Sequence, residues 1–348
     1  MKRKQGAKGL MAIKIDFKKA YDRLRWAFIR DTLMQINLSL LLVSTIMECV
    51  TSTSLKVLWN GESSESFLPS RGIRQGDQLS PYLFVICMER LYQTIEEAII
   101  LKRWRPIRAC RDGPVLSNLF FTNDIILFAE ASMDQAIVIQ EYLERFCMAS
   151  GQKVSLPKSR VFFSNNVCED NRNAIYTTLG MDSTMNLGLH LGMPTLSSRI
   201  TKEKFSHLCE KIDRRLVGWK TKYLSLTGRI TLAKSTISSM AFYSMQTEKL
   251  PLAICDEIDK RTRWFIWGGS ETKRATHLLA WEVLQNPREF GGIRIRSASQ
   301  ANAAFLTKLG WRVLTETNSL CSRVLRAKYC NGRCDVDMFN AKPGMSNV

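Results

Sequence analysis

The chain has 348 residues, with 50 Lys and Arg against 32 Asp and Glu, and a formal net charge of +18. This surplus favours nucleic acid as the partner, because Lys and Arg neutralise phosphates and release counterions; a solvated basic surface is the alternative. No apolar run reaches the roughly 18–20 residues that a membrane span requires. No signal peptide is recognisable either. These two observations predict a nuclear or cytoplasmic protein without a membrane partner.

The length of the chain is sufficient to bury a sizeable core and predicts two or three domains. The ten cysteines are scattered along the sequence. In a chain of this size, that distribution is typical of reduced thiols rather than of a disulfide framework.

The first hundred residues alternate short apolar runs with helical patterns. Residues 12–17 form an apolar run that carries Asp16 near its end, and a helical pattern follows. Further along, Asn60-Gly61 lies between two short runs and is a strong signal for a two-residue hairpin. The apolar residues of segment 81–100 recur at helical spacing, which predicts a helix packed on the core.

Residues 119–128 combine two runs rich in Phe and Ile with the polar triplet Thr122-Asn123-Asp124. This pattern favours two strands joined by a tight turn, with one carboxylate at the tip. A helix is predicted over residues 133–150, with Ile137 among its inward-facing residues and Gly151 just past its end. The order of the elements predicts an α+β fold, an antiparallel sheet with helices on one face.

Asp16 and Asp124 each lie at the end of a predicted strand. If the two strands are neighbours, the two carboxylates converge on one cation. A site built only from oxygen atoms suits Mg²⁺, which proteins usually hold with one or two carboxylates together with substrate phosphates. For each aspartate alone, the alternative is a turn or helix-cap residue.

Three segments, in order along the chain, resemble the reverse transcriptases of LINE-type non-LTR retrotransposons found in plant genomes. They read Ile-Asp-Phe-Lys-Lys-Ala-Tyr-Asp at 15–22, Pro-Ser-Arg-Gly-Ile-Arg-Gln-Gly-Asp at 69–77, and Leu-Phe-Phe-Thr-Asn-Asp-Ile-Ile-Leu-Phe at 119–128. The resemblance implies a polymerase palm over residues 1–187 with the fingers largely missing. It also implies a primer-grip hairpin and helical thumb over 188–250, and a truncated, mostly helical C-terminal extension over 251–348.

The resemblance further implies roles for single residues. Asp16 and Asp124 would hold Mg²⁺, or Mn²⁺ in its place, and the partners would be an RNA template, a DNA primer and deoxynucleoside triphosphates. The residues expected to bind the nucleotide are Tyr21, Arg74, Gln75, Gly76 and Lys158. An ordinary core tyrosine is the alternative for Tyr21, and a solvated side chain is the alternative for Arg74.

Asn123 departs from the family, whose hairpin tip carries two adjacent aspartates. An asparagine keeps a carbonyl oxygen but loses the negative charge that balances Mg²⁺. This degenerate position, together with the missing fingers, predicts a catalytically defective relic of an RNA-directed DNA polymerase. Two alternatives stay open: a weakly active polymerase that uses Asp16 and Asp124, and a non-enzymatic, basic nucleic-acid-binding protein.

Overall fold

The computed structural model describes residues 6, 8–108, 110, 113–184, 189–190, 193–194, 205–217, 224–269 and 276–330. The chain divides into two compact units, Met1–Thr195 and Leu196–Val348. The primer-grip hairpin expected at the start of residues 188–250 corresponds to residues 188–194, where the structure pairs β10 (Leu189–His190) with β11 (Met193–Pro194). Residues 188, 191 and 192 of that expectation lie outside the described residues.

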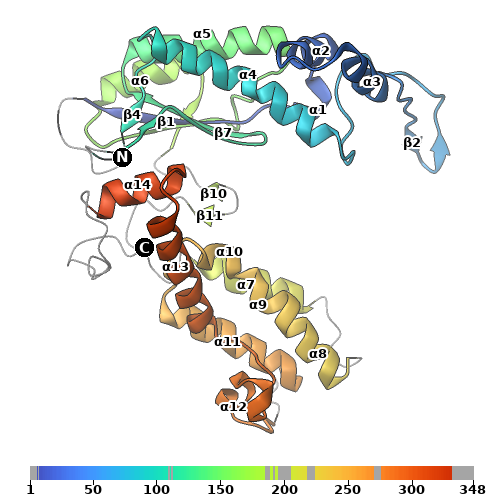
Figure 1. The fold of residues 1–348 in the computed structure, drawn as a ribbon, viewed down its shortest axis with the longest axis vertical. Coiled ribbons are helices and arrows are strands. Elements are labelled where there is room, and N and C mark those ends of the chain that lie inside the picture. The colour runs from blue at the N-terminus through green and yellow to red at the C-terminus, as the bar shows by residue number, and fades with distance from the viewer. Residues whose placement is uncertain are drawn as a thin grey trace. The chain divides into compact units, whose positions relative to one another are not determined.

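Unit 1 is built on a five-stranded sheet in which the first strand is central (Figure 1). The strand order is β6 (Asn118–Phe121), β7 (Asp124–Glu130), β1 (Leu10–Ile15), β8 (Arg160–Phe163) and β9 (Asp182–Ser183). Strand β1 runs antiparallel to both of its neighbours, β7 and β8.

The expectation of an antiparallel sheet is wrong at one edge. Strand β9 runs parallel to β8. The reason is the connection between them, because helix α6 (Glu169–Leu179) carries the chain back before β9 begins, and such a crossover returns a strand in the same direction.

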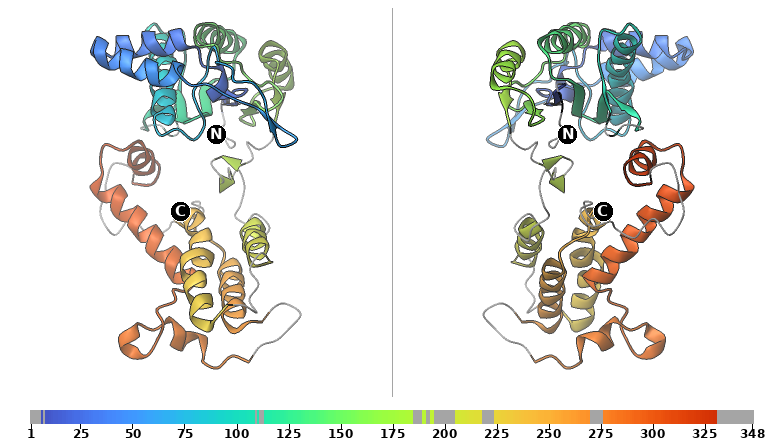
Figure 2. Two further views of the ribbon diagram at one scale, coloured as in Figure 1. Left: turned by 90° about the vertical axis from the view of Figure 1, so that its right-hand side faces the viewer. Right: turned by 90° about the vertical axis from the view of Figure 1, so that its left-hand side faces the viewer.

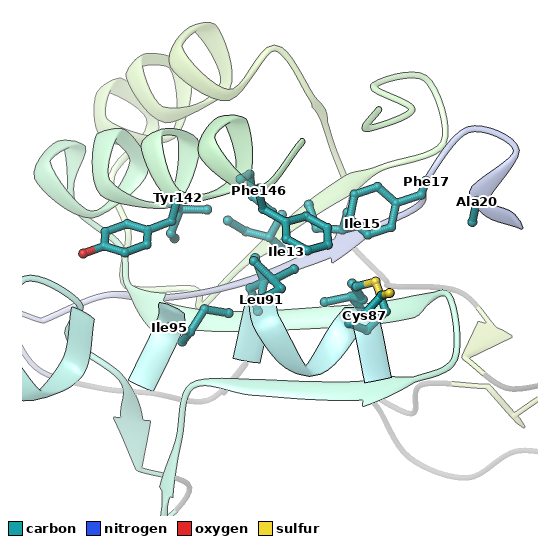
Figure 3. Packing of buried hydrophobic residues seen from close by; sticks show 14 of the residues in the cluster. Ile13, Ile15, Phe17, Ala20, Cys87, Leu91, Ile95, Tyr142 and Phe146 are labelled. Atoms are coloured by element: carbon teal, nitrogen blue, oxygen red, sulfur yellow. The ribbon is translucent and has the colours of Figure 1, made fainter. Parts of the chain in front are cut away.

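One face of this sheet is covered by helices (Figures 1 and 2). The helices of unit 1 are α1 (Ala20–Arg23), α2 (Trp26–Gln35), α3 (Leu40–Thr51), α4 (Ser80–Ile100), α5 (Met133–Ser150) and α6. Figure 3 shows Ile13 and Ile15 of β1 beside Leu91 of α4 and Phe146 of α5. Because side chains alternate along a strand, the even-numbered residues of β1 point to the opposite face.

Helix α5 has the predicted bounds, and it ends at Gly151, whose φ of 80° is left-handed. The position of Ile137 was predicted wrongly, since this side chain is 51% exposed. The buried row is Ala136, Ile139, Leu143 and Phe146. These residues recur at i, i+3, i+7 and i+10, so Ile137 falls between two members of the inward-facing row, one position after Ala136 and two before Ile139.

The hairpin predicted at Asn60-Gly61 is present. It joins β2 (Leu58–Trp59) to β3 (Glu62–Ser63), and both turn residues have positive φ, 50° and 87°. Two positive φ values in a two-residue loop are the geometry that Asn-Gly favours. A further short pair joins β4 (Ile107–Arg108) to β5 (Val115–Leu116).

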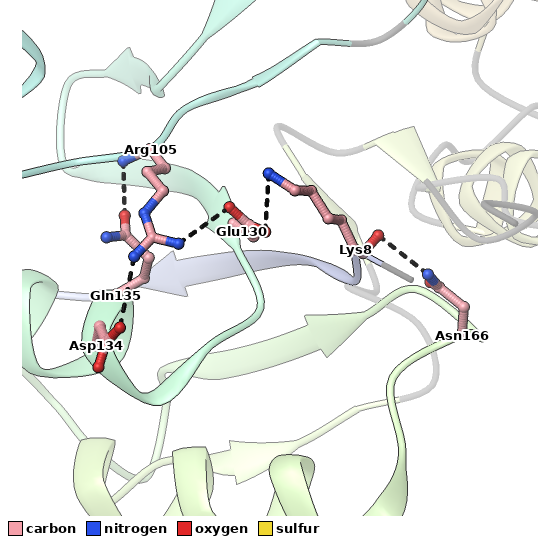
Figure 4. A network of polar contacts seen from close by, with 6 residues as sticks. All are labelled: Lys8, Arg105, Glu130, Asp134, Gln135 and Asn166. Atoms are coloured by element: carbon pink, nitrogen blue, oxygen red, sulfur yellow. Dashed lines mark hydrogen bonds and ion pairs between the residues drawn. The ribbon is translucent and has the colours of Figure 1, made fainter. Parts of the chain in front are cut away.

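A polar network ties together the ends of β1 and β7 that lie farthest from the Asp124 turn (Figure 4). Glu130, the last residue of β7, forms ion pairs with Lys8 at 3.6 Å and with Arg105 at 3.4 Å, and Arg105 also reaches Asp134 at 3.4 Å. The buried Gln135 side chain accepts a hydrogen bond from the Arg105 N–H at 2.6 Å. The network joins the segment just before β1, the end of β7 and the start of α5.

Unit 2 is helical in its described residues. Its elements are α7 (Ser206–Val217), α8 (Leu226–Leu232), a π-helical turn (Ala233–Ile237), α9 (Ser238–Met240), α10 (Phe242–Met245), α11 (Leu252–Trp267), α12 (Trp281–Gln285), a 3₁₀ turn (Arg288–Phe290), α13 (Ala298–Thr315) and α14 (Leu320–Tyr329). One apolar core joins Ile212, Ile237, Ile258 and Phe265. Residues on both sides of Pro251 therefore share a core.

None of the helices in the described ranges is long and apolar enough to cross a membrane.

Candidate metal and nucleotide site

Asp16 and Asp124 are brought to the same edge of the sheet by the pairing of β1 with β7. The last paired residues of the two strands are Ile15 on β1 and Ile125 on β7. Asp16 follows Ile15 and Asp124 precedes Ile125, so the two aspartates are the next pair of facing residues. Residues that face each other across antiparallel strands share a face of the sheet, with Cβ atoms about 4.5–5.5 Å apart. Both aspartates are half-buried, and they lie on the face that the helices leave uncovered.

Asn123 lies at the turn between β6 and β7, immediately before Asp124, and its side chain is exposed. Thr122 precedes it with a φ of 51°. The Thr122 hydroxyl is 2.7 Å from the carbonyl oxygen of Phe121 and 3.1 Å from the Asn123 Oδ1 atom, within donating distance of both. A neutral amide therefore occupies the tip of the hairpin beside the half-buried carboxylate.

Two carboxylates on adjacent strand ends fit a divalent cation of the Mg²⁺ type, because such ions take one or two carboxylates and complete their shell with water and phosphate oxygens. They do not form a self-sufficient cage. Within the described ranges, no group of three or more His, Cys, Asp or Glu side chains is placed to hold a metal.

The glycine-rich loop before α4 is anchored on the segment that follows Asp16. The Gly72 N–H donates to the Leu24 carbonyl at 2.7 Å, and the Ile73 N–H donates to the Tyr21 carbonyl at 2.9 Å. The Trp26 indole N–H donates to the Gly72 carbonyl at 2.7 Å. These bonds fix Gln75 near Tyr21, as the proposed nucleotide-binding role of both residues requires.

Asp22 was missed by the sequence reasoning, although it ends the first family-like segment. Its carboxylate accepts a hydrogen bond from the Gln75 amide at 3.2 Å. Both residues line a pocket of about 490 Å³, together with Arg71, Arg74 and Asp77 of the loop. The two arginines are exposed. The lining of the pocket thus contains both positively and negatively charged side chains, and Cys49 and Val50 of α3 form an apolar side.

Tyr21 is half-buried, and its ring stacks on Phe84 of α4 with centroids 4.9 Å apart and planes 9° apart. Phe84 is fully buried in the core. The contact supports a packing role for Tyr21 and at the same time fixes the orientation of the ring. A contact between Tyr21 and a nucleotide sugar stays a prediction.

Lys158 is exposed on a short turn between Ser155 and Ser159. The turn lies against the Asp16 backbone, since the Ser155 N–H donates to the Asp16 carbonyl at 2.7 Å. The structure thus places a basic side chain beside the strand end that carries Asp16.

Gly76 and Gly72 share a φ of 91° but differ in their surroundings. A Cβ added at Gly76 would meet no atom within 4 Å, whereas a Cβ at Gly72 would lie 2.8 Å from the Asp22 carbonyl oxygen. Gly76 thus has open space in front of its backbone, as close approach by a ligand requires. Gly72 is needed for the internal packing of the loop.

Comparison with known proteins identifies a family and several relatives. The family described as Reverse transcriptase (RNA-dependent DNA polymerase) matches residues 1–212. A putative ribonuclease H protein of Arabidopsis thaliana is 42% identical over 137 residues, which is 39% of this chain and 22% of that protein. A retrovirus-related Pol polyprotein from a type-2 retrotransposable element of Drosophila melanogaster is 32% identical over 145 residues, 41% of this chain and 13% of the polyprotein.

Among solved structures, a telomerase from Candida albicans in complex with a fragment of telomeric RNA aligns with a TM-score of 0.38 at 12% identity. The alignment covers 94% of this chain and 50% of the telomerase chain. The matched stretch therefore spans at most half of each of these three proteins.

The two glycines give a testable contrast. Alanine at either position must adopt a left-handed backbone, which costs roughly 1–2 kcal/mol. Gly72→Ala must also displace the Asp22 backbone, so we expect it to lower the free energy of unfolding by at least about 1 kcal/mol more than Gly76→Ala. Urea denaturation followed by tryptophan fluorescence measures both. Equal losses would show that the loop does not pack against Asp22 as described.

Proposed function

Because the chain belongs to the reverse transcriptase family, we propose that it descends from the RNA-directed DNA polymerase of a non-LTR retrotransposon and that it is catalytically defective. The observation that carries this proposal is the neutral Asn123 at the hairpin tip, immediately before Asp124, the residue that faces Asp16 across the two strands. In this proposal, unit 1 acts as the palm and the helices after residue 196 include the thumb.

In the reaction in question, the 3′-oxygen of a primer paired with an RNA template attacks the α-phosphorus of a deoxynucleoside triphosphate. The hydroxyl loses its proton, the bond between the α- and β-phosphates breaks, and pyrophosphate leaves. Asp16 and Asp124 would hold the divalent ion, which supplies positive charge to the phosphate oxygens when bound. Arg74 and Gln75 line the pocket at the glycine-rich loop. They would contact the nucleotide, while Lys158 would lie near the triphosphate and the Tyr21 ring would pack beneath the sugar.

The defect that we assign to Asn123 is one of charge rather than of shape. Stabilisation of transition-state charge by a bound metal is worth several kcal/mol, and each 1.36 kcal/mol changes the rate tenfold. Loss of one principal anionic ligand is therefore expected to lower the rate on the order of a thousandfold. The Asn123 side chain is exposed at the hairpin tip and lies outside the apolar core, so we expect the fold not to depend on this charge.

The direct test is primer extension on a poly(rA) template with either Mg²⁺ or Mn²⁺. We expect no detectable extension from the unaltered chain with either ion. The Asn123→Asp variant provides the comparison, and any extension that it gains should disappear when Asp16→Ala is added. Asp182→Ala removes an exposed carboxylate from the far edge of the same sheet and serves as the control. Robust Mg²⁺-dependent extension by the unaltered chain, abolished by Asp16→Ala, would contradict the proposal.

A second candidate function, nucleic-acid binding without catalysis, is favoured by the distribution of charge. Residues 196–348 contain 26 Lys and Arg against 13 Asp and Glu, whereas residues 1–195 contain 24 against 19. Most of the net charge of +18 thus belongs to unit 2. On α7, Lys211 and Arg214 are exposed while Leu208 and Ile212 face the core, so the helix presents positive charge away from that core.

This candidate predicts binding that depends on salt and not on sequence. The logarithm of the affinity for single-stranded RNA should fall linearly with the logarithm of the salt concentration in a filter-binding titration. The double substitution Lys211→Gln and Arg214→Gln should reduce the magnitude of that slope by about 1.4, because each phosphate contact on a single strand contributes about 0.7. Lys102→Gln and Arg108→Gln, which change unit 1 by the same charge, should leave the slope unchanged. Affinity that is constant from low to physiological salt would show that the basic surplus is only a solvated surface.

A further inference from the structure

Strand β1 is held at both ends by serine hydroxyls from the segments that flank β8. At its start, the Leu10 N–H donates to the Ser164 hydroxyl at 2.8 Å. At its end, the Asp16 N–H donates to the Ser159 hydroxyl at 3.2 Å. Both serines are 0% exposed. A buried hydroxyl thus accepts a backbone N–H at each end of the central strand.

The pairing between β1 and the β8 segment changes register at Asp16. Lys14 pairs with Arg160, but the next bridge joins Phe17 to Val154. Between these two pairs the β1 side has two residues, and the other side has the five residues of 155–159. The three extra residues form a bulge, a feature often found beside active sites, where it redirects a side chain.

The bulge is closed by its own hydrogen bonds. The N–H groups of Lys158 and Ser159 both donate to the Ser155 carbonyl, at 3.0 and 2.9 Å. The bulge also binds both backbone polar groups of Asp16. Its Ser159 hydroxyl accepts the Asp16 N–H, and its Ser155 N–H donates to the Asp16 carbonyl at 2.7 Å. At this residue the regular pairing of the strands has been replaced by a local turn.

We propose that Ser159 is a positioning residue for the Asp16 carboxylate. By accepting the Asp16 N–H it fixes the backbone from which that carboxylate projects, on the sheet face shared with Asp124. Through the same turn it holds Lys158 at a constant separation from Asp16. This inference rests on the proposed function, because it presupposes that Asp16 and Asp124 bind a divalent cation.

The chemistry of the site explains why a hydroxyl is needed there. Metal ligands have to be held to within about half an ångström of their binding geometry by the groups around them. Alanine at 159 would leave the partly buried Asp16 N–H without its acceptor, so the backbone would relax and the carboxylate would shift. Alanine at 164 would do the same to the Leu10 N–H, six residues away at the other end of β1. Ser164 therefore provides a control that is matched in burial and partner strand, and its hydroxyl additionally donates to the Asn166 Oδ1 atom at 2.6 Å.

The experiment measures Mn²⁺ binding to the full-length chain carrying Asn123→Asp, from the electron paramagnetic resonance signal of free Mn²⁺. Asp16→Ala should abolish the binding. Ser159→Ala should weaken it about fivefold, as expected for one lost hydrogen bond to a partly buried N–H, and Ser164→Ala should change it less than twofold. Ser159→Cys, which retains a weak acceptor of similar size, should give an intermediate value.

Hydrogen exchange should show faster exchange of the Asp16 amide in Ser159→Ala and of the Leu10 amide in Ser164→Ala.

The outcomes separate this inference from the proposed function. If Asp16→Ala abolishes binding but the Ser159→Ala and Ser164→Ala variants bind equally well, the metal site stands and the positioning role is wrong. Equal loss of binding in both serine variants, with equally lowered melting temperatures, would also overturn it, since the effect would then be one of general stability. If no binding depends on Asp16, the proposed site and the inference both fail.

Discussion

The pairing of β1 with β7 in one fixed register is the constraint on which the rest of unit 1 depends. Successive side chains of a strand point to opposite faces, so a slip of one residue would move Asp16 from the open face into the core. The register is held by burial, because Met11, Ile13 and Ile15 on β1 and Ile125 and Leu127 on β7 all belong to the same core. It is also held by polar contacts at each end of β1. The Glu130 network lies at the start of β1, and the Ser155–Ser159 bulge lies at Asp16.

The fold and the proposed chemistry make different demands on the hairpin tip. The fold requires a residue with positive φ at Thr122 and buried apolar residues after Asp124. It requires nothing of the exposed side chain at 123. A carboxylate lost at this position therefore removes charge from the site without affecting the packing that holds Asp16 and Asp124 together. This independence would allow an intact sheet to carry the loss of charge that we propose for the site.

The sequence predicted best those elements whose signals are local. The bounds of α5, the hairpin at Asn60-Gly61, the buried stripe of α4 and the two-strand hairpin around Asp124 follow from spacing, turn chemistry and apolar runs. The order and strand-end positions of Asp16 and Asp124 could also be predicted, although their roles rest on the family resemblance. These features depend on a few adjacent residues.

Features that depend on distant contacts could not be predicted. The parallel pairing of β9 depends on where α6 returns the chain, and the bulge at Ser155–Ser159 is visible only once β1 and β8 are paired. The exposure of Ile137 depends on which row of α5 meets the sheet. Asp22 could have been found, because it lies within the first family-like segment, but its bond to Gln75 joins residues more than fifty positions apart.

The central claim is that Asp16 and Asp124 form a metal site whose only local defect is Asn123. A crystal structure of the Asn123→Asp chain grown with Mn²⁺ tests it most directly, through the anomalous signal of the metal. We expect a peak at the ends of β1 and β7, bound by oxygen atoms of Asp16 and Asp124. Carboxyl groups more than about 8 Å apart could not share a metal cluster, given ligand distances near 2.1 Å and metals about 4 Å apart. That separation, or a peak bound elsewhere, would contradict the account.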